Sequence, residues 1–152
     1  MRKWGSLLVC VLLAFGAGFV GSRFLPGDWY AALAKPSFNP PNSVFAPVWS
    51  VLYLLMAIAA WRAWRKGGHG PAMGLWLAQL VLNAAWSWLF FGRHLLGVAL
   101  VDIVCLLALI IATTVAFFRR DRAAGWMMVP YIAWVSFATV LNAALWHLNP
   151  GA

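Results

Sequence analysis

Apolar residues fill five long segments of the chain, and charged residues, glycines and prolines separate these segments. Each segment is close to the length that an α-helix needs to cross about 30 Å of hydrocarbon at about 1.5 Å per residue. Strands of a membrane β-barrel would be about ten residues long with strict alternation, which is absent. The pattern predicts an all-α fold, one integral membrane domain of five transmembrane helices over residues 1–152. The segments are residues 4–20, 44–64, 72–91, 95–118 and 125–146.

Composition supports a membrane protein. Hydrophobic residues make up 64% of the chain and charged residues 9%, whereas soluble domains are about 45–50% apolar. The net charge is +8, and the charges cluster at the ends of the apolar segments, which is typical of topology signals and lipid headgroup contacts. No basic stripe with a base-stacking module accompanies them, so we expect the lipid bilayer as a partner and no nucleic acid.

Loop charges predict the orientation. The N-terminus and the second and fourth connections carry eight of the Lys and Arg residues, and the other side carries three. By the positive-inside rule, the N-terminus faces the cytoplasm and the first connection, at about residues 22–43, faces outward. The first segment also fits a secretory signal with a small-x-small site at Ala14-Phe15-Gly16, and this alternative stays open.

Small residues near the end of the first segment indicate a close helix contact. In "AFGAGFVG", Ala14 and Gly18 are four residues apart, as are Ala17 and Gly21. Such spacing lets two helix backbones approach each other in lipid. The pattern predicts a contact of this helix and is compatible with self-association.

Tryptophan is abundant, with eleven residues in the chain. Tryptophan anchors helices at membrane interfaces, and this role suffices for the residues near the predicted helix ends. The remaining four, Trp49, Trp86, Trp88 and Trp134, call for another explanation because most share helix faces with polar residues. The seven predicted interface residues are Trp4, Trp29, Trp61, Trp64, Trp76, Trp126 and Trp146.

Three of the predicted helices carry an aromatic and polar stripe. Residues at helical spacing share one face, and a carboxamide in lipid needs a partner because an unpaired one costs a few kcal/mol. We expect the stripes to face inward, where they form either a core of hydrogen bonds and rings or a small-molecule pocket with a few polar groups. The stripes are Trp49, Tyr53 and Met56; Gln79, Asn83, Trp86, Ser87 and Phe90; and Tyr131, Trp134, Ala138 and Leu141, with Asn142 beside them.

Few residues suit conventional catalysis. Asp102 lies about two turns into the fourth segment, where a charge is costly, and we expect it to reach the interface or to pair with Arg93, in a structural rather than catalytic role. HExxH, GxSxG and phosphate-loop motifs are absent from the sequence. His69, His94 and His147 fall at predicted loop or helix ends, so we expect neither a metal site nor axial haem ligation inside the bundle.

The first connection is rich in proline. Pro36, Pro40 and Pro41 fix φ and donate no backbone hydrogen bond, so this stretch resists helix formation. A stiff loop of this kind forms a lid across the mouth of the bundle at low ordering cost, or serves as a plain connector. We assign Phe38 to the lid with these prolines. Pro47 falls in the first turn of the second helix, where its missing N–H costs little.

The stretch "WYAALAKPSFNPPNSVFAPVWSVLY" closely resembles the TspO/MBR family of tryptophan-rich sensory proteins, relatives of the mitochondrial translocator protein. "NAAWSWLFFG", "ATTVAFF" and "PYIAWVSFATVLNAALWHLN" extend the likeness in order over nearly the whole chain. The resemblance implies a bacterial five-helix receptor or sensor, commonly a homodimer, with a pocket closed by the first loop. It implies binding of tetrapyrroles such as porphyrin or haem, and of benzodiazepine-site drugs, as ligands rather than required cofactors.

Carried over by motif, the resemblance implies a specific set of pocket residues. It also makes Trp49 and Trp134 the candidates for light-dependent porphyrin degradation, an enzymatic alternative to sensing; a porphyrin transporter and a scaffold without ligand are further alternatives. Sterol binding is in doubt, because "VLNAALWHLN" lacks the Tyr and basic residue of the cholesterol pattern. The implied ligand-binding residues are Trp49, Tyr53, Asn83, Trp86, Trp134 and Ala138.

Overall fold

The structure, a computed structural model, is an all-α bundle, as the sequence predicts. It describes residues 2–23, 27–67 and 70–149; residues 24–26 of the predicted lid and His69 lie outside this description. Five helices are long and apolar enough to span a membrane. They are α1 (Arg2–Ser22), α3 (Phe45–Arg65), α4 (Pro71–Ser87), α5 (Leu96–Phe118) and α6 (Arg122–Leu148).

Three short elements lie between these helices. The helix α2 (Asp28–Ala32) and the 3₁₀ turn η1 (Asn42–Val44) belong to the first connection. The π-helical turn η2 (Trp88–Gly92) continues α4 directly. The sequence did not predict α2, whereas residues 34–41, which contain the three prolines, are free of helix as expected.

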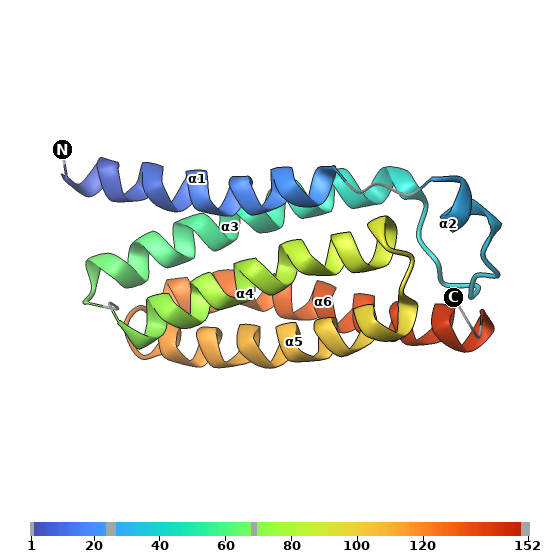
Figure 1. Cartoon of the computed structure of the whole chain (residues 1–152). Coiled ribbons are helices and arrows are strands. Elements are labelled where there is room, and N and C mark those ends of the chain that lie inside the picture. Colours follow the sequence, from blue (N-terminus) through green and yellow to red (C-terminus); the bar gives the residue numbers. More distant parts are fainter. Residues whose placement is uncertain (1, 24–26, 68–69, 150–152) are drawn as a thin grey trace.

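The long helices form a closed ring. Each packs against two main neighbours in the cyclic order α1, α3, α6, α5, α4, and Figure 1 shows them running side by side. The connections α3–α4 and α5–α6 lie at one end, which we call the loop end. The opposite end, which we call the lid end, carries α2, η2 and the end of α6 (Figure 1).

The helix faces explain this arrangement. On α5, the buried residues Ala99, Ile103, Leu106 and Ile110 follow helical spacing, and apolar valines cover the opposite face. A helix that is apolar on both faces suits a position between a protein core and lipid. The other spans repeat this pattern, and α1 is the least buried of them.

The small residues of α1 make contacts inside the bundle. Ala14 is fully buried, and a Cβ atom at Gly18 would lie 2.7 Å from the ring of Tyr53 on α3. A Cβ atom at Gly21 would lie 3.2 Å from the Ser87 hydroxyl on α4. The predicted contact is therefore an intramolecular one, and this face of α1 is not open for self-association.

One expectation about a side chain was wrong, and one of the two alternatives for Asp102 fails. Trp76 is 1% exposed and lies inside the bundle rather than at an interface, because it precedes Gln79 by three residues on the inward face of α4. Asp102 does not pair with Arg93: the Arg93 guanidinium lies over the Trp88 ring, 5.7 Å from its centroid. One carboxylate oxygen of Asp102 is buried and has no hydrogen-bond partner among the described residues.

An ion pair joins the end of α3 to the α5–α6 connection at the loop end. Arg62 Nε donates to Asp121 Oδ2 at 2.5 Å. Asp121 also caps α6, because Oδ2 accepts from the Ala124 N–H. The hydrogen bond from Arg62, assisted by its charge, by the Ala124 N–H and by Lys66, holds the pKa of Asp121 below its usual value.

We predict that Gly18→Ala lowers the free energy of unfolding by about 1–3 kcal/mol, because the added methyl group overlaps the Tyr53 ring. Gly16→Ala is the matched control, since nothing lies within 4 Å of a Cβ atom there. Denaturant titration of the purified protein in mild detergent measures both. Equal stability of the two variants would show that α1 does not pack closely on α3.

We also predict an acid-sensitive contribution from Asp121. Its pKa is lowered in the folded state, so the stabilisation is present above the unfolded pKa of about 3.9 and disappears as the pH falls through the lower folded value. Because Arg62 is partly exposed, the effect should stay below about 1 kcal/mol. The difference between the free energies of unfolding at pH 7 and at pH 3 should be smaller in Arg62→Gln than in the parent protein or in the control Arg93→Gln. An undiminished difference in Arg62→Gln would contradict the ion pair's role.

Candidate functional site

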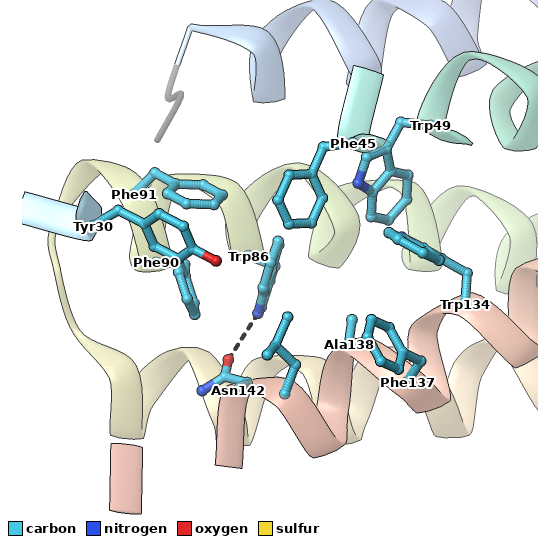
Figure 2. A pocket seen from close by; sticks show the side chains of 11 residues that line it. Tyr30, Phe45, Trp49, Trp86, Phe90, Phe91, Trp134, Phe137, Ala138 and Asn142 are labelled. Carbon is cyan, nitrogen blue, oxygen red and sulfur yellow. Dashed lines mark hydrogen bonds between the residues drawn. The ribbon is translucent and has the colours of Figure 1, made fainter. Parts of the chain in front are cut away.

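An aromatic cavity lies at the lid end, between α3, α4 with η2, α6 and the lid segment, which we define as residues 27–44. Its free volume is about 20 Å³, close to the space of one water molecule. Figure 2 shows ring side chains turned toward it from all sides. The lining residues are Tyr30, Phe45, Trp49, Trp86, Phe90, Phe91, Trp134, Phe137, Ala138, Leu141 and Asn142.

Helix geometry brings these rings together. Phe45 and Trp49 are one turn apart at the start of α3. Trp134, Ala138 and Leu141 share the inward face of α6, as the spacing predicts. The π-helical turn η2 places both Phe90 and Phe91 on the cavity wall; such turns are often found at functional sites.

The rings at the α3–α6 side pack on one another, two pairs edge to face and one tilted. Trp49 and Trp134 have centroids 6.5 Å apart and an interplanar angle of 89°. Phe45 meets Trp134 at 6.2 Å and 73°, and Phe137 lies 5.5 Å from Trp134. Such pairs contribute about 0.5–1.5 kcal/mol each beyond their buried area.

Polar groups at the cavity wall are few and mostly occupied. Trp86 Nε1 donates to Asn142 Oδ1 at 3.0 Å (Figure 2), and Asn142 Nδ2 donates to the Leu96 carbonyl at 2.9 Å. The Tyr30 hydroxyl donates to Asn39 Oδ1 at 2.8 Å. The indole nitrogen of Trp134 is buried and has no partner among the described residues, which makes it a donor available to a ligand.

A buried hydrogen-bond network lies deeper in the bundle. The Tyr53 hydroxyl donates to Asn83 Oδ1, and Asn83 Nδ2 donates to the Tyr131 hydroxyl at 2.8 Å. Tyr131 in turn donates to Gln79 Oε1 at 2.7 Å, and Gln79 Nε2 contacts the sulfur of Met56 at 3.7 Å. The network ties α3, α4 and α6 together and gives partners to the side-chain amides of Gln79 and Asn83 inside the membrane.

Four of the six ligand-binding residues predicted from the sequence line the cavity, and two lie beneath it. Trp49, Trp86, Trp134 and Ala138 line the cavity. Tyr53 and Asn83 do not line it, because the Asn83 amide is engaged by the two tyrosines. Asn83 therefore supports the cavity from the layer beneath it.

The lid segment closes the cavity through several contacts. Asn149, just after α6, forms two hydrogen bonds with Ala34: its Oδ1 accepts from the backbone N–H at 2.9 Å and its Nδ2 donates to the carbonyl at 2.8 Å. Trp29 stacks on His94 at 4.2 Å with an interplanar angle of 7°. Phe38 meets Phe137 edge-on at 6.2 Å.

The prolines shape the lid through their carbonyl groups. Pro36 accepts from the Asn39 N–H at 3.1 Å and Pro41 from the Val44 N–H at 3.0 Å, while Pro40 accepts from Asn39 Nδ2 at 3.2 Å. None of these prolines lines the cavity. They hold the turn that carries Phe38 toward α6.

Tyr30 is the residue of the lid segment that reaches the cavity. It is 2% exposed, and its ring lies 5.5 Å from Phe91. Burial raises the pKa of the Tyr30 phenol, and the hydrogen bond with Asn39 partly offsets this effect. Tyr30 is therefore a neutral hydrogen-bond donor that anchors the lid to its own turn.

Several lining residues were not identified as site residues from the sequence. Phe45 and Phe137 stand at helical spacing from Trp49 and Trp134, so the periodicity contains a signal for both. Phe90 and Asn142 were placed on or beside the inward stripes but without a role in the site. Tyr30 and Phe91 reach the cavity through α2 and the π-helical turn, which the apolar pattern does not reveal.

The fold and the cavity define an α-helical integral membrane protein with a lidded aromatic site. The sequence model of the TspO/MBR family matches residues 7–147, and the chain belongs to this family. It is 41% identical to the tryptophan-rich protein TspO of Chlorobaculum tepidum, over 95% of this chain and 96% of that protein. It is also 42% identical to the translocator protein of Homo sapiens, over 88% and 83% of the two chains.

A third relative carries the name that the sequence resemblance suggested. The tryptophan-rich sensory protein of Cereibacter sphaeroides is 39% identical, over 95% of this chain and 92% of that protein. These similarities confirm the family and support a membrane receptor or sensor of the TspO type.

We predict that Asn83→Leu lowers the free energy of unfolding by about 1–3 kcal/mol, because it leaves the buried Tyr53 hydroxyl without its acceptor and removes one bond to Tyr131. Tyr53→Phe combined with Asn83→Leu should cost less than the sum of the single changes, with a coupling of about 0.5–2 kcal/mol. Denaturant titration of all three variants measures the coupling. Strict additivity would show that the two groups do not interact in the membrane protein.

Proposed function

We propose that this protein is a membrane receptor or sensor that binds tetrapyrroles, such as protoporphyrin IX or haem, and related flat hydrophobic molecules in the aromatic cavity. The observation that carries the proposal is the box formed by Phe45, Trp49, Trp134 and Phe137. Rings presented from two helices suit the faces of a planar macrocycle, and small-molecule sites are mostly apolar with a few placed polar groups.

The proposed ligand requires the cavity to expand. Sites for ligands of this size enclose about 300–1,000 Å³, whereas the free volume here is about 20 Å³. The walls that must separate are the aromatic side chains, since the backbone of the long helices is fixed by the network below. The proposal is therefore of induced fit at the lid end, with Ala138 leaving room for the ligand on α6.

Orientation and assembly are part of the proposal. The basic loop end faces the cytoplasm and the lid end faces outward, as the distribution of Lys and Arg favours. The family resemblance implies a homodimer, and the apolar outer faces of the spans are compatible with one.

Light-dependent breakdown of a bound porphyrin is the second candidate function. The observation that favours it is the position of two oxidisable indoles, Trp49 and Trp134, side by side at the cavity wall. Illumination of the bound complex separates it from sensing, because an enzyme would form product in excess over protein and would lose this activity in Trp49→Phe and Trp134→Phe.

We predict saturable quenching of tryptophan fluorescence when protoporphyrin IX is titrated in the dark into the protein in lipid nanodiscs. Ala138→Phe should raise the dissociation constant at least about tenfold, because the added ring fills the space beside Trp134. Val81→Phe is the matched control, since Val81 is exposed on the outer face of α4. Trp49→Ala should also raise the dissociation constant. Because it adds no bulk, it tests the same site without the risk that an added ring disturbs folding.

Two outcomes would overturn the proposal. One is linear, unsaturable quenching of the parent protein, which is the signature of porphyrin dissolved in lipid. The other is binding by both Ala138→Phe and Trp49→Ala with the dissociation constant of the parent, which would place the ligand elsewhere. Each variant is first checked for an unchanged helical spectrum and elution volume.

A further inference from the structure

A second, larger hollow lies on the outer side of the bundle. It is a groove of about 580 Å³ between α3 and α6, and its wall is apolar apart from one indole. Pro47, Val51, Pro130 and Ala133 are exposed at its surface. Because α3 and α6 are membrane spans, this groove opens toward the lipid. Its lining residues are Pro47, Val48, Val51, Leu52, Pro130, Ala133, Trp134 and Phe137.

The groove and the aromatic cavity share part of their walls. Trp134 and Phe137 line both spaces, and no other residue does. Their rings are 5.5 Å apart and form a partition of two side chains between the lipid-facing groove and the cavity. Displacing these two rings would join the spaces into one passage from the bilayer.

Ring contacts, rather than hydrogen bonds, hold this partition: Trp134 also packs against Phe45 and Trp49. The Trp134 indole nitrogen has no hydrogen-bond partner among the described residues, so turning the ring breaks no hydrogen bond. Phe137 meets Trp134 in a tilted ring pair and Phe38 edge-on, without any polar contact. Pro130 stands one turn before Trp134 within α6, where it leaves the Trp126 carbonyl without its intrahelical donor and permits local bending.

The lid route is more firmly closed. Opening it breaks the two hydrogen bonds between Asn149 and Ala34 and separates the stacked rings of Trp29 and His94. A flat hydrophobic ligand is also concentrated in the bilayer rather than in water, because apolar surface is driven out of water. The location of the ligand in the bilayer favours the lateral route, and so does a partition that opens without the loss of a hydrogen bond.

We propose that the α3–α6 groove is the entry vestibule for the ligand, and that Trp134 and Phe137 form a lateral gate between the bilayer and the aromatic cavity. The ligand first lies in the groove against Pro47, Val51 and Ala133, then displaces the two rings and stacks inside. The proposal rests on the proposed function, since it assigns the path by which that ligand reaches its site.

Rate measurements distinguish an entry path from an equilibrium binding site, because a residue on the path changes both rates and leaves the dissociation constant unchanged. Ala133→Phe narrows the groove without lining the cavity, so protoporphyrin IX should associate and dissociate about tenfold more slowly with an unchanged dissociation constant. Asn149→Ala loosens the lid and should leave both rates unchanged. Stopped-flow fluorescence in lipid nanodiscs in the dark measures the rates, and Val81→Phe on the outer face of α4 controls for added bulk at the lipid surface.

Three results would overturn the gate. Parent rates in Ala133→Phe would show that the groove is not on the path. A changed dissociation constant with an unchanged association rate would make the groove part of the equilibrium site. Faster association in Asn149→Ala would assign entry to the lid. Failure of the proposed function is a separate result, namely the absence of saturable binding by the parent protein at equilibrium.

Discussion

The buried hydrogen bonds among Tyr53, Asn83, Tyr131 and Gln79 are the constraint on which the arrangement of the bundle depends. Hydrocarbon offers no water to satisfy two carboxamides, so the helices that carry them must meet partners from other helices. Asn83 uses its oxygen toward α3 and its nitrogen toward α6. This fixes the rotation of three helices about their axes and therefore the direction in which each aromatic stripe faces.

The network sets the direction of the aromatic side chains that line the cavity, but it does not hold these side chains rigidly. Trp49 lies one turn from Tyr53 on α3, and Trp134 lies one turn from Tyr131 on α6. Both tryptophans line the cavity. Ring contacts, one indole–amide bond and the lid segment hold these groups, and a narrow space remains between them. A rigid polar layer beneath a deformable aromatic layer suits a protein that admits large planar molecules without losing its helix packing.

Most of the fold was predictable from the sequence, because apolar length and helical periodicity report directly on spans and on their inward faces. Periodicity placed Trp49, Trp86, Trp134 and Ala138 on inward stripes, and the family resemblance implied their place in a pocket, where they line the cavity. Periodicity could not separate Tyr53 and Asn83 from the cavity wall, because depth along a shared face depends on which partner each polar group finds. The helix α2 and the π-helical turn that turns Phe91 inward depend on tertiary contacts that the pattern does not encode. The burial of Trp76 was in the pattern, since Trp76 precedes Gln79 by three residues on the inward face of α4.

The most direct test of the central claim is the position of a bound macrocycle relative to the two layers. Paramagnetic relaxation by Mn(III) protoporphyrin IX, read on backbone amides of the protein in lipid nanodiscs, locates the metal without a substitution. The account predicts the strongest broadening around Phe45, Trp49 and Ala138, with weaker effects at Gln79. Broadening centred on the loop end, or spread evenly over the lipid-facing residues, would contradict it.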